Sequence, residues 1–138
     1  MVKDIIKDVD ILTKKSEKFI FRMDEALIQD LMDTANTHKD NCAGLAAVQI
    51  GVHKRVFLVR VGDDFIPFIN PVIVKRSGGT YVANESCLSL DGSREVKRYN
   101  TITVVYAERN GKIKKHAFNG FIAQVIQHEC DHLNGVLI

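Results

Sequence analysis

The stretch Gln127-His128-Glu129-Cys130-Asp131-His132-Leu133-Asn134-Gly135 decides the fold and the chemistry that we expect of this chain. It contains His-Glu-x-x-His, which on a helix places His128 and His132 one turn apart on one face. Two imidazoles so placed can bind one metal ion, and Glu129 beside them can transfer a proton. In 138 residues with 5 His, roughly 0.01 matches to this pattern are expected by chance. The stretch is therefore a candidate metal site.

The helix that carries the motif is expected to begin at residues 119–120 and to end at Gly135. Ile122, Ile126 and Cys130 fall on one face of this helix. The two histidines fall on an adjoining face, together with Val125. Because this helix is apolar almost all round, we expect it to be buried at the centre of the fold. Cys130 points away from the histidine face and is expected in the core.

The rest of the chain predicts one small α+β domain. Residues 1–22 show no clean period and are interpreted as an N-terminal arm. Apolar residues at helical spacing predict an amphipathic helix from Asp24, a candidate N-cap, to about His38. Runs rich in β-branched residues predict strands. The strands are expected over 56–61, 65–69, 72–74, 101–107 and 112–118.

Glycine-containing segments separate these strands. Turns are expected at 62–64, at 77–79 and at 110–111, where Asn-Gly is a strong signal for a two-residue hairpin. Residues 84–94 are interpreted as a strand end and a loop. Pro67 and Pro71 predict an edge position or a strand end, because proline cannot donate to a neighbouring strand.

The composition excludes several classes of protein. A net charge of +2 is lower than nucleic-acid binders usually carry. No apolar run approaches the roughly 20 residues that cross a bilayer, and residues 1–5 are too mixed for a secretory signal. Three cysteines are an odd number and argue against a disulfide framework. We therefore expect a single cytoplasmic domain over 1–138, with no membrane and no specific nucleic-acid partner.

A catalytic metal usually has three protein ligands, so the two histidines need a third. Only six residues follow His132, and Ile138 stands where one group of metalloproteases has a third histidine. The third ligand is therefore expected upstream, as a histidine, a carboxylate or a cysteine. Cys87 is modestly preferred to Cys42, because Glu85 and other polar neighbours can orient a ligand there. The upstream histidines are His38, His53 and His116.

Three segments of the chain resemble the signature motifs of the peptide deformylases. They are Gly44-Leu45-Ala46-Ala47-Val48-Gln49, Glu85-Ser86-Cys87-Leu88-Ser89 and the stretch 127–135. The motifs occur in the order found in that family, and the similarity extends over most of the chain. Three motifs in a fixed order are far more specific than His-Glu-x-x-His alone.

The resemblance implies an α+β fold in which antiparallel sheets pack around a central helix bearing both histidines, beside the N-terminal helix at 24–38. It implies one divalent metal ion, typically Fe2+ and replaceable by Zn2+, Ni2+ or Co2+, held by Cys87, His128 and His132. It implies removal of the formyl group from the N-terminal formyl-methionine of nascent proteins. N-formylmethionyl peptides are then the expected substrates, and a transient contact with the ribosome is expected.

Glu129 is the expected general base for a metal-bound water. Two imidazoles and a thiolate leave less positive charge on the metal than three imidazoles do, so the water is acidified less and needs a base. The resemblance assigns stabilisation of the oxyanion to the Gln49 amide and the Leu88 backbone N–H. The candidates for orienting Arg98 or a ligating histidine are Glu85 and Asp131.

Residues on the histidine face are expected to form the substrate pocket. Phe121, Gln124 and Val125 lie one or two turns before the ligands and are expected to line a pocket for the methionine side chain. A glycine in the first motif would let the substrate backbone approach closely. The peptide is expected to contact Gly44, Leu45 and Arg94.

The chain departs from the family pattern at three places. Cys42-Ala43-Gly44 stands where Gly-aliphatic-Gly is usual, Ser86 replaces the glycine of Glu-Gly-Cys, and many members continue past the third motif with a C-terminal helix. These departures leave open a deformylase-like protein that has lost its activity or acts on another N-acyl substrate. A zinc peptidase and a structural metal module are further alternatives. A structural site would usually have four protein ligands.

Overall fold

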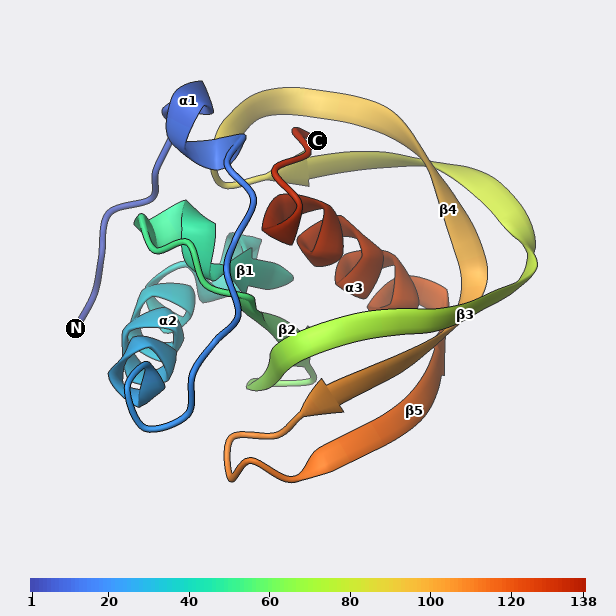
Figure 1. The fold of residues 1–138 in the computed structure, drawn as a ribbon. Coiled ribbons are helices and arrows are strands. Elements are labelled where there is room, and N and C mark those ends of the chain that lie inside the picture. The colour runs from blue at the N-terminus through green and yellow to red at the C-terminus, as the bar shows by residue number, and fades with distance from the viewer.

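One helix near the C-terminus, α3 (Gly120–Leu133), runs through the middle of the molecule (Figure 1). The computed structural model describes residues 1–138 and has the α+β architecture that the sequence predicts. In Figure 1, α2 (Glu25–Thr37) lies to the left of α3, and the longest strands sweep around its right-hand side. The prediction of a central, buried helix is therefore confirmed.

The strands form a single antiparallel sheet in which the order of pairing is the order in the chain. They are β1 (Gly44–Ala46), β2 (Val56–Val61), β3 (Asp64–Cys87), β4 (Leu90–Ala107) and β5 (Ile113–Asn119). The predicted boundaries of β2, of β5 and of the end of β4 agree with these to within one residue.

The pairing of the two longest strands, β3 and β4, is irregular at several places, and one of them is the segment 77–79 where the sequence predicts a turn. β3 has 24 residues and β4 has 18, and their pairing changes register at four places. One shift lies between Ser77 and Thr80, where Gly78 and Gly79 have φ angles of 75° and 76°. The prediction of a turn at 77–79 was wrong, because the two glycines form a bulge that bends the strand without reversing it.

The prediction of a loop over 84–94 was also wrong in most of its length. β3 continues to Cys87 and β4 begins at Leu90, so only two residues separate the paired strands. The β4–β5 hairpin is confirmed, but its turn is longer than the two residues predicted. The Glu108 backbone N–H donates to the Lys112 carbonyl across it, at 2.9 Å.

The two prolines of β3 lie where the strand needs no donor on one side. Before Ile69 the strand pairs with β2 alone, and Pro67 lies in that part. Pro71 lies within the register shift between Ile69 and Val72. The predicted edge character of this segment is confirmed for these physical reasons.

The N-terminal region contains one helix that the sequence did not reveal. α1 (Val9–Leu12) forms within the predicted arm, where the Asp8 carboxylate accepts from the Asp10 N–H at 2.8 Å. α2 follows Asp24 as expected, although the Asp24 carboxylate accepts from the Ile20 N–H instead of capping the helix.

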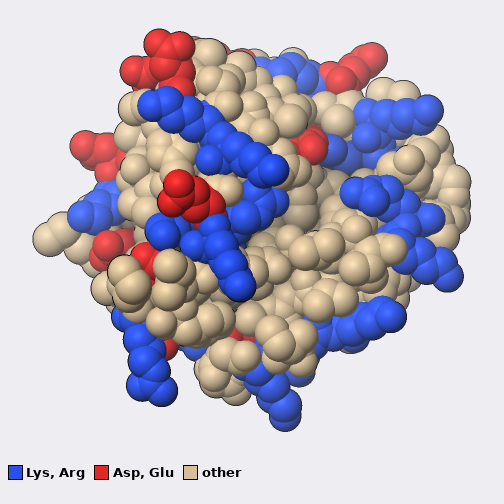
Figure 2. Space-filling model, in the orientation of Figure 1, with Lys and Arg blue, Asp and Glu red and all other residues tan.

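None of the helices combines the length and the apolar character that crossing a membrane requires. Figure 2 shows basic side chains spread over the visible face with acidic ones among them.

Two apolar clusters hold these elements together. One joins α2 to β1 and the start of the sheet, and the other surrounds α3. Around α3, Phe68 stacks between Phe57 and Tyr106, with ring centroids 5.4 and 4.4 Å away. Each such side chain contributes about 1.5–3 kcal/mol when fully buried. The Gln127 amide adds a polar anchor, because it both accepts from and donates to the Tyr99 backbone.

The end of α3 is closed by a Schellman motif. The Gly135 N–H donates to the His132 carbonyl at 3.1 Å, and the Val136 N–H donates to the Asp131 carbonyl at 2.9 Å. Gly135 has a φ of 73°, and a Cβ there would lie 2.3 Å from the Thr13 carbonyl oxygen. The glycine predicted to end the helix therefore also allows the N-terminal arm to pack against that end.

Substituting Gly135→Ala tests this second requirement. Gly62→Ala is the matched control, because Gly62 has a φ of 62° and a Cβ added there would meet nothing within 4 Å. The control should lose about 1–2 kcal/mol from left-handed strain alone. Gly135→Ala should lose about 1–3 kcal/mol more because of the backbone contact. Urea unfolding measures both, and equal losses would contradict the close packing.

Candidate metal centre

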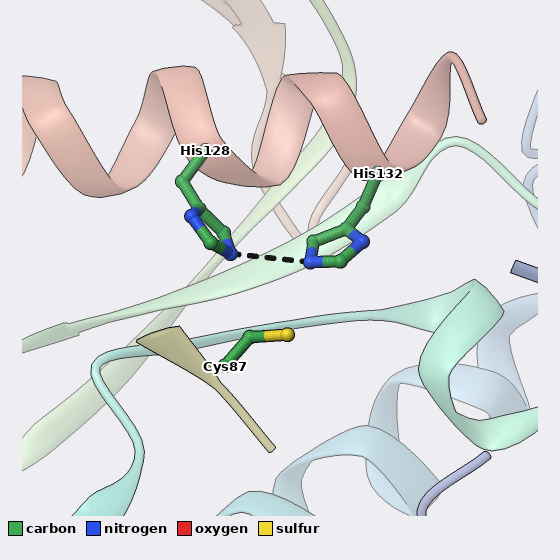
Figure 3. Close-up of side chains that lie close together, drawn as sticks. All are labelled: Cys87, His128 and His132. Carbon is green, nitrogen blue, oxygen red and sulfur yellow. Dashed lines mark hydrogen bonds between the residues drawn. The ribbon is translucent and has the colours of Figure 1, made fainter. Parts of the chain in front are cut away.

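Three side chains, two from α3 and one from the end of β3, converge beside α3. Figure 3 shows His128 and His132 pointing from α3 toward Cys87, the last residue of β3. The ligand atoms of these three residues all lie within 4.8 Å of one another. The two Nε2 atoms face each other at 3.2 Å. The structure therefore brings together the two predicted histidines and the cysteine preferred among the upstream candidates.

The donor set fits a divalent metal ion. Two nitrogens bound at about 2.0–2.1 Å in tetrahedral geometry lie ~3.3 Å apart, which is close to the separation found here. Burial lowers the pKa of His132 to about 3, so this imidazole is neutral, as a metal ligand has to be. Burial alone would raise the pKa of Cys87, but hydrogen bonds with His128 and with backbone N–H groups lower it and favour the thiolate.

A buried carboxylate orients one of the ligands. Glu85 Oε1 lies 2.8 Å from His128 Nδ1, so Nε2 of that ring is left to face the other ligands. Arg98 donates to both oxygens of Glu85, at 2.9 and 2.7 Å, and to Asp131 at 2.6 Å. Burial would raise the pKa of Glu85, but the bonds from Arg98 and His128 outweigh it and lower the pKa to about 2. The predicted contacts of Glu85 and Asp131 are confirmed.

Glu129 lies beside the ligands with one oxygen unused. Its side chain is buried, and Oε1 has no hydrogen-bond partner. Burial raises the pKa of Glu129 to about 7. A Cβ on Gly44 would lie 2.8 Å from Glu129 Oε2, so only glycine leaves room for the carboxylate there. A buried acid with a pKa near neutrality can both accept and release a proton.

Gln49 is held rigidly in the 3-10 helix η2 (Ala47–Ile50). Its side chain is 1% exposed, its oxygen accepts from the Ala46 N–H at 3.0 Å, and its nitrogen donates to Ser89 Oγ at 3.2 Å. A carboxamide nitrogen carries two hydrogens, so one N–H remains for another acceptor. Ser89 directly follows Leu88, and the amide is thereby tied to the turn that carries the second predicted donor.

A cavity of about 220 Å³ opens beside Glu129 and His128. Four of the six residues predicted to contact substrate line it, namely Gly44, Phe121, Gln124 and Val125. Phe121, which is 66% exposed, lies at the surface. Leu88, predicted as an oxyanion donor, also lines the cavity. The predicted pocket on the histidine face therefore coincides with a cavity.

Two predicted contacts lie outside the lining of this cavity. Leu45 is fully buried in the core, so only its main chain is available to a ligand. Arg94 donates from one nitrogen to the Asp91 carbonyl at 3.2 Å, while two other guanidinium nitrogens are buried without a partner.

Sequence reasoning missed several lining residues. Asn84 and Ser86 precede Cys87 on β3, and strict strand alternation would place both on the face opposite Cys87. The register shift between Glu85 and Cys87 breaks this alternation, and the sequence does not reveal it. Ala43 lies next to the motif glycine, and in the sequence it stands out only as a departure from the family pattern. Asn41, which ends the short helix η1 (Lys39–Asn41), carries no local signal.

The other two cysteines do not join the ligand group. Cys42 is 3% exposed, and its thiol donates to the Gly44 carbonyl at 3.3 Å. Cys130 packs against the cluster around α3, as predicted. Burial raises the pKa of both thiols to about 12, so both remain protonated.

Comparison with known proteins gives consistent matches over the whole chain. The family model for polypeptide deformylase matches residues 2–138. The peptide deformylase of Clostridium beijerinckii is 49% identical over 138 residues, which cover 100% of each chain. A peptide deformylase structure from Legionella pneumophila has a TM-score of 0.90 at 32% identity, covering 99% of this chain and 83% of that one.

A further structure contains a peptide. The class I type b peptide deformylase from Acinetobacter baumannii, bound to Met-Ala-Ser, has a TM-score of 0.87 at 28% identity and covers 99% of this chain and 96% of its own. Sequence and fold thus agree along the full length of the α+β domain. The family match and the end-to-end relative together show that the chain belongs to the polypeptide deformylase family.

Proposed function

We propose that this chain removes the formyl group from the N-terminal formyl-methionine of nascent proteins, with Cys87, His128 and His132 as metal ligands. Metal-dependent deformylation is the activity of the family to which the chain belongs. The observation that carries the proposal for this site is the convergence of the three ligand atoms within 4.8 Å beside a cavity that Glu129 also lines.

The metal proposed for the cell is Fe2+, with Zn2+, Ni2+ or Co2+ as substitutes. A site of one thiolate and two imidazoles accepts each of these ions. When bound, the ion supplies Lewis acidity that acidifies a water molecule and polarises the formyl carbonyl.

Glu129 is proposed as the general base. Its free Oε1 accepts a proton from the attacking water, and the same carboxyl group then delivers it to the departing amine. Its burial excludes bulk water from this transfer. The space that Gly44 leaves beside Oε2 fixes where the carboxylate lies.

Two donors are proposed for the oxyanion that forms at the formyl carbon. They are the free N–H of Gln49 and the backbone N–H of Leu88. Their rigidity supports this role, because Ala46 and Ser89 hold the Gln49 amide in one orientation. A preorganised donor of this kind typically contributes roughly 3–4 kcal/mol to the transition state.

The methionine side chain is proposed to enter the cavity between Phe121, Gln124 and Val125. Gly44, the Leu45 main chain and Arg94 would contact the peptide that follows. The structure from Acinetobacter baumannii is described as bound to Met-Ala-Ser, a peptide that begins with methionine, and this supports a peptide substrate here. We place the reaction in the cytoplasm, with a transient contact to the ribosome that presents the nascent chain.

One assay separates this function from its alternatives. The metal-loaded protein should release formate from formyl-Met-Ala-Ser and leave acetyl-Met-Ala-Ser intact, since the acetyl methyl group needs more room beside Glu129. Preferred hydrolysis of the acetyl peptide would favour another N-acyl substrate, for which Cys42 and Ser86 are the distinguishing residues. Cleavage after the methionine would indicate a peptidase.

Glu129→Gln tests the proposed base. The variant should keep its metal content and lose at least about 100-fold in kcat, because general-base catalysis typically contributes 10²–10⁴-fold. Glu95→Gln is the control, since Glu95 is an exposed acid on β4. Metal analysis and formate release measure the two properties. Turnover at the original rate would exclude Glu129 as the base.

Glu85→Gln tests whether the Glu85 carboxylate holds the ligand His128 in place for metal binding. Loss of the carboxylate charge leaves the buried Arg98 paired with Asp131 alone and weakens the hold on His128. Metal affinity, measured by competition with a chelator for Zn2+, should fall about 10–100-fold. Asp131→Asn is the control and should change the affinity less, because Asp131 is 30% exposed and contacts no ligand directly. Equal affinities in Glu85→Gln and the original protein would contradict this arrangement.

A further inference from the structure

Tyr81 contacts the cavity only through another residue. It lies on β3 with its hydroxyl donating to Gln124 Oε1 at 3.0 Å. Gln124 lines the cavity, whereas Tyr81 does not. Along β3, Tyr81 shares the inward face with Glu85, which orients His128. Two inward side chains of one strand thus each hold a side chain of α3.

The bond to Tyr81 decides which end of the Gln124 carboxamide is available. Its oxygen is engaged, and its nitrogen makes no hydrogen bond within the protein. The cavity therefore has one fixed N–H2 donor on a wall whose neighbouring α3 side chains, Phe121 and Val125, are apolar. A fixed donor costs no further ordering when a ligand binds.

We propose that Tyr81 is a positioning residue that aims the Gln124 N–H2 group at an acceptor in the substrate side chain, and that the acceptor is the methionine sulfur. The inference rests on the proposed deformylase function and names a determinant of its substrate choice. A thioether is a weak acceptor, and the isosteric norleucine side chain has none. The cavity should therefore distinguish two side chains of nearly equal size and shape.

Formyl-Met-Ala-Ser and formyl-norleucyl-Ala-Ser provide the test. The original protein should prefer the methionine peptide by about 2- to 10-fold in kcat/KM, the range for one net hydrogen bond. The preference should lie in KM and not in kcat, because Gln124 is proposed to contact the methionine side chain and not the reacting formyl group. Gln124→Leu should abolish the preference, and Tyr81→Phe should reduce it.

Tyr99→Phe is the matched control. Tyr99 lies on β4, and its hydroxyl makes no hydrogen bond to Gln124. This variant should keep the original ratio. Because the two peptides are compared within one preparation, a loss of folded protein in any variant cancels from the ratio.

Two results would overturn the inference. One is a ratio near 1 for the original protein, and the other is a ratio that Tyr81→Phe and Gln124→Leu leave unchanged. If neither formyl peptide is turned over, the proposed function fails. The inference is then judged by calorimetry of Met-Ala-Ser and norleucyl-Ala-Ser with the Zn2+-loaded protein, where equal affinities would reject it.

Discussion

The structure depends on burying a helix whose active face is polar. On α3, Gln127, His128, Glu129 and His132 are all buried. A buried polar group without a partner costs about 1–3 kcal/mol. The sheet supplies most of the partners, through the Tyr99 backbone and the Glu85 carboxylate. The two side-chain atoms of α3 left unsatisfied, Glu129 Oε1 and His132 Nδ1, both belong to the candidate site, where an unsatisfied group can have a chemical use.

Much of this arrangement could be predicted from local sequence. The periodicity of α3 and the β-branched run of β2 each indicate one structure, so their boundaries were predicted within a residue or two. The continuity of β3 could not be predicted. Glycines at 78–79 fit a turn as well as a bulge, and only pairing with a distant part of β4 decides between them.

The residues of the candidate site likewise fall into those that local sequence could predict and those that it could not. Spacing within one helix predicts the two histidines, whereas the residues alone favoured Cys87 only modestly, and the family resemblance singled it out. Arg98 lies 33 residues from Asp131 and 13 from Glu85, so the sequence could name these carboxylates as candidates but could not show that Arg98 bonds to both. Tyr81 has no signal at all, since its significance comes from the position of Gln124 on another element.

The position of α3 along the chain has a consequence for synthesis. All five strands precede it, so they are synthesised before the helix around which they curve. Until then the inward-facing side chains of the sheet, such as Phe57, Phe68 and Ile102, lack their central packing partner. Exposed apolar surface of this kind promotes aggregation. The core around α3 and the candidate site therefore both require this helix, the last element to be synthesised.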